Sequence, residues 1–187
     1  MKRKLSLSLA VVLLLSMSAF GAAFAESTQE IVFALQNEPD GIDPGITNNS
    51  FASPFLANCF EGLVTYDTAT GSLIGGDAES WTISEDGTTY TFKLRDGLKW
   101  SDGSPLTAKD YVYAYQRILK PETTAQYVSL LTDYIVGAQE FYDGTGGADA
   151  LGVKALDDMT LELTLKTATP YYVDVLTMWT FSPVQQA

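Results

Sequence analysis

The sequence predicts a mixed α/β fold, of the α+β kind, in the part of the chain that follows an N-terminal export signal. Short runs of alternating apolar and polar residues, joined by turns that contain Gly and Asp, predict antiparallel strands. An apolar repeat at helical spacing predicts an amphipathic helix between these strands. Hydrophobic residues make up 46% and aromatic residues 12% of the 187-residue chain. This composition is typical of a chain with a packed core.

The first 25 residues predict a cleaved signal peptide. Lys2-Arg3-Lys4 forms a positive start, Leu5 to Met17 is apolar, and Ala23-Phe24-Ala25 places small residues at a cleavage position. The apolar run is shorter than the roughly 20 residues that a membrane-spanning helix needs. Cys59 lies too far downstream to carry a lipid anchor. We therefore expect a periplasmic or secreted product that begins at Glu26.

Charge and composition exclude several classes of function. The chain has 11 Lys and Arg, 23 Asp and Glu, one Cys and no His, which gives a net charge of −12. An acidic chain is a poor partner for nucleic acid or for anionic membranes, because both bind clustered Lys and Arg. Without His, and with a single Cys, the usual catalytic relays, zinc sites and disulfide frameworks cannot form. We expect no enzyme activity, no catalytic residue, no metal and no cofactor.

The N-terminal part of the exported segment is expected to contain one strand and one helix. Residues 31–35 form a continuous apolar run, the pattern of a strand that is buried on both faces. A helix is predicted from Pro54 to Glu61, with Ser53 as its N-cap and Gly62 closing it. Cys59 lies in this apolar helical context and is expected to be buried as a small hydrophobic residue.

The rest of the chain predicts a small antiparallel meander, one strong helix and a second hairpin. Thr107 with Asp110 resembles a capping box at the start of the helix, which should end before Pro121. Its apolar positions have the spacing i, i+3, i+4 and i+7. The expected strands are 81–83, 90–94 and 98–100 in the meander and 151–156 with 161–165 in the hairpin, and a final helix is expected over 171–179.

Carboxylate pairs leave one enzymatic alternative open. Glu61 with Glu79, or Asp102 with Asp110, could serve as the two carboxylates of a glycoside hydrolase, but that assignment depends on their separation in space. Most of these residues lie at turns or caps, where Asp has a local role. Residues 143–149 are superficially similar to a calcium loop but lack its alternating ligands and its final Glu. A secreted carbohydrate-acting enzyme and a free-standing secreted interaction module remain the alternatives from other classes.

One long stretch carries a family resemblance. It comprises Ala78-Glu79-Ser80-Trp81 and then residues 90–110, with Asp96-Gly97, Trp100-Ser101-Asp102-Gly103 and Thr107-Ala108-Lys109-Asp110 in order. It resembles the signature of the family 5 extracellular solute-binding proteins, the peptide receptors of ABC importers. Further similarities are Asp43-Pro44, Phe60-Glu61-Gly62-Leu63, residues 113–117, Leu151 to Asp158 and residues 181–184. The resemblance extends over residues 30–184 and is strongest to the oligopeptide-binding subfamily.

The resemblance implies a two-lobed periplasmic-binding-protein-like fold of the class II type, which closes over a peptide held mainly through its backbone. It implies an oligopeptide ligand, ABC permease subunits as partners and a monomeric receptor. The same family also includes receptors for dipeptides, nickel chelates and sugars. The implied ligand contacts are Asn48, Asn49 and Ser50 after the first strand, and Tyr127 in the intermediate domain.

The resemblance also implies a division of the chain. After the signal peptide, residues 26–65 would begin the first lobe, 66–144 would form the small intermediate β-rich domain, and 145–187 would return to the first lobe. Family members are much longer, and the sequence stops directly after an apolar stretch. We therefore expect an N-terminal fragment, in which the first lobe is incomplete and the second lobe is absent.

Overall fold

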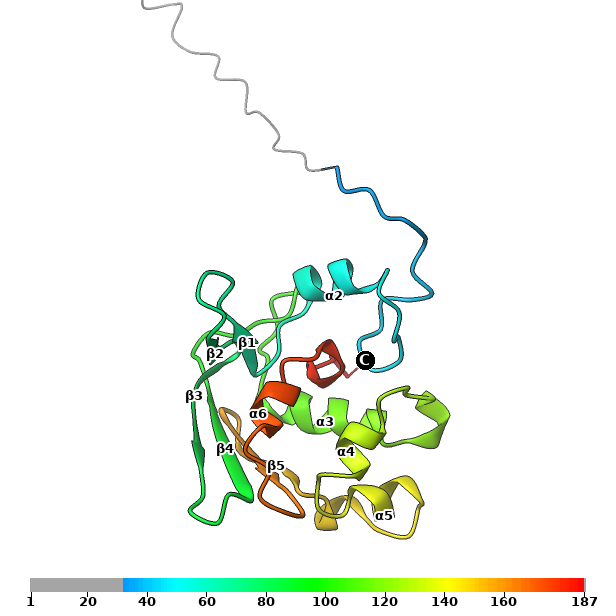
Figure 1. Cartoon of the computed structure of the whole chain (residues 1–187). Helices are drawn as coiled ribbons and strands as arrows, with labels where there is room; N and C mark the ends of the chain where they lie inside the picture. Colours follow the sequence, from blue (N-terminus) through cyan, green and yellow to red (C-terminus); the bar gives the residue numbers. More distant parts are fainter. Residues whose placement is uncertain (1–31, 187) are drawn as a thin grey trace, which may run out of the picture. The chain divides into compact units, whose positions relative to one another are not determined.

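A computed structural model describes residues 32–186 of the chain (Figure 1). The predicted signal peptide, its cleavage position and Ile31 lie outside these residues. The chain divides into two units, residues 1–34 and 35–187. Only residues 32–34 of the first unit are described. Among the described residues, no helix is both long and apolar enough to cross a bilayer.

The second unit is built on a four-stranded antiparallel sheet with the strand order β3-β4-β6-β5. Its strands are β3 (Ala78–Ile83), β4 (Thr89–Leu94), β5 (Val153–Asp157) and β6 (Thr160–Thr164). The expected hairpins β3–β4 and β5–β6 both form, and β4 pairs with β6, with Phe92 opposite Leu161. A separate two-stranded hairpin contains β1 (Val64–Tyr66) and β2 (Leu73–Gly75).

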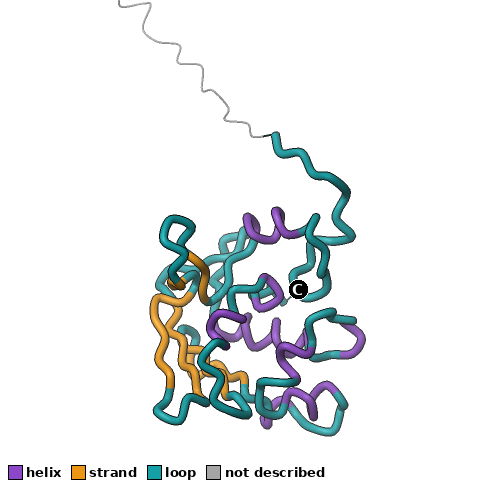
Figure 2. The backbone as a smooth tube through the Cα atoms, in the orientation of Figure 1, coloured by secondary structure: helices purple, strands orange, loops and turns teal. Residues whose placement is uncertain are grey.

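Helices cover one face of the four-stranded sheet, as Figure 2 shows. The longest is α3 (Ala108–Ile118), and shorter ones are α4 (Ser129–Thr132), α5 (Ala138–Tyr142) and α6 (Tyr172–Val175). The helix α2 (Ser53–Cys59) lies apart from this sheet, at the top of the view in Figure 1. Single 3-10 turns lie at Pro121–Thr123, Ala148–Ala150 and Trp179–Phe181. Two layers thus enclose one core.

The core is aromatic and lies between α3 and the sheet. On β4 the side chains alternate, so that Tyr90, Phe92 and Leu94 are buried. Tyr111 and Tyr115 of α3 are buried against them. The ring centroids of Tyr115 and Phe181 lie 5.6 Å apart in an edge-to-face arrangement, which is a favourable geometry for aromatic pairs. The predicted period-2 and period-3.6 faces are therefore the faces that pack together.

The capping box of α3 is confirmed. The Asp110 carboxylate accepts hydrogen bonds from the Thr107 backbone N–H at 2.7 Å and from the Thr107 hydroxyl at 3.0 Å. Asp110 also contributes a negative charge to the first turn, which the helix dipole favours. The helix ends at Ile118, before Pro121 as expected.

Two strand predictions were wrong. Residues 32–35 are not in a strand, and Val32 and Phe33 are exposed. A strand buried on both faces needs partner strands to satisfy its backbone, and the described chain offers none there. Residues 98–100 form only an isolated bridge, Lys99 with Pro105, because β6 rather than this segment pairs with β4.

Four predictions about the helices were also wrong. Ser53 is the first residue of α2, and Ala52 precedes it as the N-cap without a side-chain hydrogen bond. The helix ends at Cys59, and Cys59 is exposed instead of buried, because α2 buries only Leu56. The expected helix over 171–179 is reduced to α6 and a 3-10 turn at Trp179–Phe181.

The sheet joins two segments that the sequence analysis separated. β4 was assigned to residues 66–144 and β6 to residues 145–187, yet the two are adjacent strands of one sheet. The boundary at 144/145 stays a prediction about how the lobes of a longer receptor divide.

Candidate functional site

An ion pair ties the loop formed by residues 43–50 to α3. The Arg117 guanidinium donates from Nη1 to Asp43 Oδ1 at 2.9 Å and from Nη2 to Oδ2 at 2.5 Å. This hydrogen-bonded pairing raises the pKa of Arg117 above its ordinary value. The Asp43 carbonyl accepts the backbone N–H groups of Ile46 and Thr47. Because a two-pronged pair fixes orientation as well as position, Asp43 both shapes the loop and attaches it.

The predicted ligand-contacting residues of this loop have different surroundings. Asn48 and Ser50 are exposed. Asn49 is half-buried, and its Oδ1 accepts the backbone N–H groups of Phe51 at 3.0 Å and Ala52 at 2.9 Å. The Asn49 side chain therefore has a local role at the entrance to α2, and the polar groups of Asn48 and Ser50 face solvent.

Tyr127 lies on a second segment that starts from the same end of α3. It is half-buried and directly precedes the turn that leads into α4, where its carbonyl accepts the N–H of Leu130. The hydroxyl of Thr123 donates to the carbonyl of Arg117 at 2.5 Å. Arg117 thus anchors the loop through its side chain and the 121–127 segment through its backbone. No hydrogen bond among the described residues joins Tyr127 to residues 48–50.

A buried acidic residue, Asp77, lies at the centre of a polar cluster that the sequence did not reveal. Asp77 as a whole is only 3% exposed. Asp77 Oδ2 accepts a hydrogen bond from the hydroxyl of buried Tyr111 at 2.7 Å. Arg95 Nη2 lies 3.5 Å from Asp77 Oδ1 and also pairs with Glu61. The cluster joins the residues before β1, the end of β4 and α3.

Close backbone packing brings Asp77 to this position. The Asp77 N–H donates to the carbonyl of Gly62 at 2.8 Å, and its carbonyl accepts the N–H of Arg95 at 2.9 Å. A Cβ atom on Gly76 would lie 2.5 Å from the Gly62 carbonyl oxygen. Only glycine allows this approach.

Burial shifts the titration of this cluster. Burial is the main cause that raises the pKa of Asp77 to about 6, and the nearby negative charge of Glu61 acts in the same direction. The Tyr111 hydrogen bond and the Arg95 charge oppose the shift. Burial is the largest cause that raises the pKa of Tyr111 well above its ordinary value, and the negative charge of Asp77 is the next largest. A carboxyl group that titrates near neutral pH is uncommon and is found often, but not only, at functional sites.

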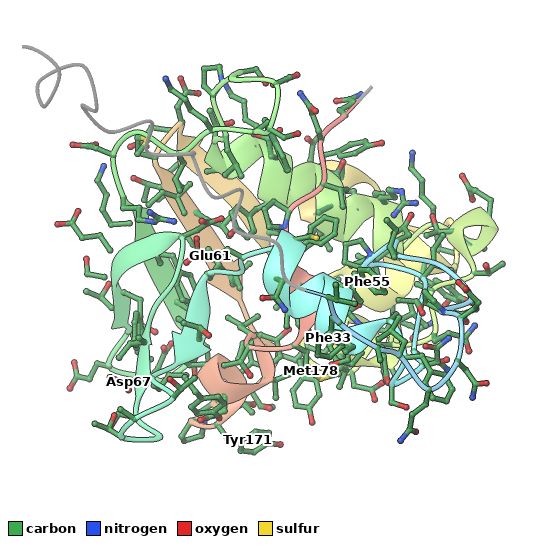
Figure 3. The ribbon with its side chains drawn as sticks, turned by 90° about the horizontal axis from the view of Figure 1, so that it is seen from above. Phe33, Phe55, Glu61, Asp67, Tyr171 and Met178 are labelled. Atoms are coloured by element: carbon green, nitrogen blue, oxygen red, sulfur yellow. The ribbon has the colours of Figure 1, made fainter. Side chains whose placement is uncertain are left out.

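Two hollows flank residues 59–61. One, of about 510 Å³, lies between α2 and residues 177–182, and the other, of about 540 Å³, lies between Glu61, Arg95 and Trp100. Figure 3 shows Phe55 of α2, Glu61 and Met178 on the face seen from above. Phe55 is 41% exposed. An open, partly apolar surface with polar groups at one end is suited to binding a ligand or another segment of protein.

The carboxylate pairs considered as enzymatic groups have local partners. Glu61 pairs with Arg95. Asp102 accepts hydrogen bonds from the Ser104 backbone at 2.8 Å and hydroxyl at 2.6 Å, and Asp110 caps α3. Within residues 32–186, no group of three or more His, Cys, Asp or Glu side chains is arranged to hold a metal ion.

The Asp43–Arg117 pair and the Asp77 cluster are the features that sequence reasoning missed. Both link residues far apart in the chain, so spacing could not reveal them. The available signal was that Asp43-Pro44 and Arg117 each belong to a motif of the resemblance.

Comparison with known proteins gives a consistent result. Residues 72–187 match the family of bacterial extracellular solute-binding proteins, family 5, in its middle region. The chain is 39% identical over 152 residues to the oligopeptide-binding protein OppA of Bacillus subtilis, covering 81% of this chain and 28% of that protein. It is 38% identical over 156 residues to the probable deoxycholate-binding periplasmic protein YgiS of Escherichia coli, covering 82% and 29%.

A solved structure agrees with these relatives. The periplasmic oligopeptide-binding protein OppAIV of Borrelia burgdorferi, an oligopeptide ABC transporter component, superposes with a TM-score of 0.77 at 42% identity. The match covers 80% of this chain and 30% of that one. The chain thus spans less than a third of the length of these relatives, and its mixed α/β fold is that of part of a periplasmic binding protein. The chain belongs to the bacterial extracellular solute-binding proteins, family 5, which are binding proteins rather than enzymes.

Proposed function

We propose that this chain supplies the N-terminal part of an exported receptor that binds oligopeptides and delivers them to the permease of an ABC importer. The observation that carries the proposal is the agreement in sequence and fold with oligopeptide-binding relatives over about 80% of the chain. The receptor acts as a monomer, without catalytic activity and without nucleic acid. The export signal in residues 1–25 would direct it out of the cytoplasm.

In this proposal the loop 43–50 and Tyr127 form one side of the peptide cleft. Asn48 and Ser50 are exposed, and the loop that carries them is held by Arg117. A fixed loop loses less conformational entropy when it binds a peptide than a flexible one does. The peptide would pair with the backbone of residues 48–50, in the manner of strand addition, while Tyr127 packs on a side chain.

The remainder of the cleft would come from the portion of the receptor that this chain does not span. We therefore expect the chain alone to bind peptides poorly. Titration calorimetry of the 187-residue chain with a mixture of tri- to pentapeptides should show no saturable binding in the micromolar range. Saturable micromolar binding would refute the view that a second lobe is required.

A chimera tests the function itself. Residues 30–187 would replace the matched N-terminal region of the B. subtilis oligopeptide-binding protein, and the chimera would be titrated with oligopeptides, dipeptides and deoxycholate. We expect oligopeptides to bind most tightly. Preferential binding of dipeptide or bile acid would contradict the proposed cargo, and failure of all three would contradict the proposed function.

Substitutions in the same chimera test the proposed contacts. Tyr127→Ala should weaken peptide binding about tenfold, roughly the loss of one buried aromatic contact. Tyr142→Ala is the matched control, because Tyr142 is also half-buried but lies on α5. Equal effects of the two substitutions would exclude a specific role for Tyr127.

A further inference from the structure

A groove on the flank of α3 has no part in the proposed peptide cleft. It has a volume of about 900 Å³ and lies between the outer flank of α3 and strand β5. One wall is formed by α3 and the residues that follow it, and the other by Val153–Leu156 of β5. We call it the α3–β5 groove. The groove is thus formed between a helix and an edge strand of the sheet.

The helix contributes a second stripe of side chains to this groove. Lys109, Val112, Tyr113 and Gln116 have the spacing i, i+3, i+4 and i+7, so they share one face of α3. This face differs from the buried one, which contains Tyr111, Tyr115 and Ile118. Val112 and Tyr113 are half-buried. The middle of the stripe is thus partly apolar and remains open to a partner.

The strand contributes an unpaired edge. β5 is the last strand in the order β3-β4-β6-β5. Within the described residues, the backbone of 153–157 has no backbone hydrogen bond other than those to β6. Leu156 is 55% exposed, and Lys154 is exposed as well. Such an edge presents free N–H and C=O groups to which an extended segment can add.

The charge of the groove is opposite to that of the whole chain. Three of the eight Lys and Arg that follow residue 25 line it, namely Lys109, Lys120 and Lys154. Lys109 pairs with Asp158 at 2.7 Å, whereas no salt bridge among the described residues involves Lys120 or Lys154. Asp149 is the one acidic residue among those that line the groove. A chain with a net charge of −12 therefore has a locally basic groove.

We propose that the α3–β5 groove is a docking surface for an extended segment of another protein, which adds to β5 as a strand and carries acidic side chains alternating with apolar ones. Successive side chains of the added strand would face opposite sides of the sheet, so the acidic ones would lie on the side of Lys154 and the apolar ones on the α3 side, against Val112 and Tyr113. The five residues of β5 span roughly 16 Å, which fits a partner segment of similar length. A second copy of this chain is a poorer partner, because β5 pairing with β5 would bring two copies of Lys154 close together.

The test uses fluorescence anisotropy with a labelled octapeptide of alternating Glu and Val, and a second octapeptide with Lys in place of Glu. The Glu-Val peptide should bind the 187-residue chain saturably below 1 mM, and the Lys-Val peptide should bind at least tenfold more weakly. Lys154→Glu should weaken binding of the Glu-Val peptide at least fivefold. Lys99→Glu is the matched control, because it changes the charge equally at an exposed residue outside the groove, and it should change binding less than twofold.

Backbone pairing has a separate readout. The bound Glu-Val peptide should slow amide hydrogen exchange in β5, and an analogue with N-methyl groups on alternate residues should not bind. The proposal is overturned by the absence of saturable binding up to 1 mM, by equal binding of the two peptides, or by equal effects of Lys154→Glu and Lys99→Glu. It is also overturned if sedimentation shows a dimer of the chain that Lys154→Ala strengthens, because the occupant would then be a second copy. None of these outcomes depends on peptide transport, so they test the docking surface independently of the proposed function.

Discussion

Replacing Asp77 with Asn should stabilise the protein at neutral pH and remove part of the pH dependence of its stability. Asp77 is buried, and its pKa is raised from 3.8 to about 6. Between these two values the folded protein binds more protons than the unfolded chain does, so its free energy of unfolding falls as the pH rises. The stabilising contribution is complete below pH 3.8 and is lost as the pH passes 6. A shift of about two units corresponds to about 3 kcal/mol.

The amide of the Asp77→Asn variant cannot ionise, and its oxygen can still accept the hydrogen bond from Tyr111. We therefore expect the variant and the unmodified protein to have similar stabilities near pH 4. At pH 7.5 the variant should be more stable by about 1–3 kcal/mol. Urea denaturation followed by tryptophan fluorescence at both pH values gives the two free energies of unfolding. The reasoning is refuted if Asp77→Asn is less stable than the unmodified protein at pH 7.5, or if the difference is the same at both pH values.

Asp86 provides a control of the opposite sign. Asp86 is exposed, and two sets of hydrogen bonds hold its pKa below the ordinary value. The hydrogen bond from Ser84 has the largest effect, and those from Thr88 add to it. Its carboxylate form therefore contributes stability above the ordinary pKa, and that contribution is lost on acidification. Asp86→Asn should lower the stability at pH 7.5 and have little effect at low pH. Two Asp-to-Asn substitutions in one chain thus have opposite expected effects.

Three further predictions concern other parts of the fold. A double-mutant cycle with Arg117→Ala and Asp43→Ala, measured by urea denaturation, should give a coupling energy of about 1 kcal/mol. Either single variant should also speed amide exchange at residues 46–52. A coupling energy of zero would contradict the anchoring role. Cys59 should react with a maleimide in the native protein at nearly the rate seen in urea, since it is exposed; a requirement for denaturant would contradict this. Gly137→Ala, measured by thermal denaturation, should cost more than about 1 kcal/mol of stability. Gly137 has φ of 71°, and a Cβ there would lie 2.3 Å from a backbone oxygen. Gly147→Ala, at an open position, should be nearly neutral in the same assay.

Local patterns in the sequence were sufficient for the hairpins and for α3. The alternation over 89–94 and the turn before it determine β3–β4, since every second side chain must reach the core. Thr107 and Asp110 determine where α3 begins, because both cap contacts form within one turn of chain. The family was also evident from sequence, because its signature lies in this contiguous scaffold.

Tertiary structure alone decided the rest, because it depends on contacts between residues far apart in the chain. Sequence could not show that β4 pairs with β6 rather than with residues 98–100, since both are compatible with an antiparallel partner. It could not show that Cys59 is exposed, because an apolar context does not reveal whether anything packs on it. The Asp43–Arg117 pair bridges 74 residues, and Asp77 meets Tyr111 across 34. Electrostatic pairing and burial are properties of folded distances, and spacing along the chain does not contain them.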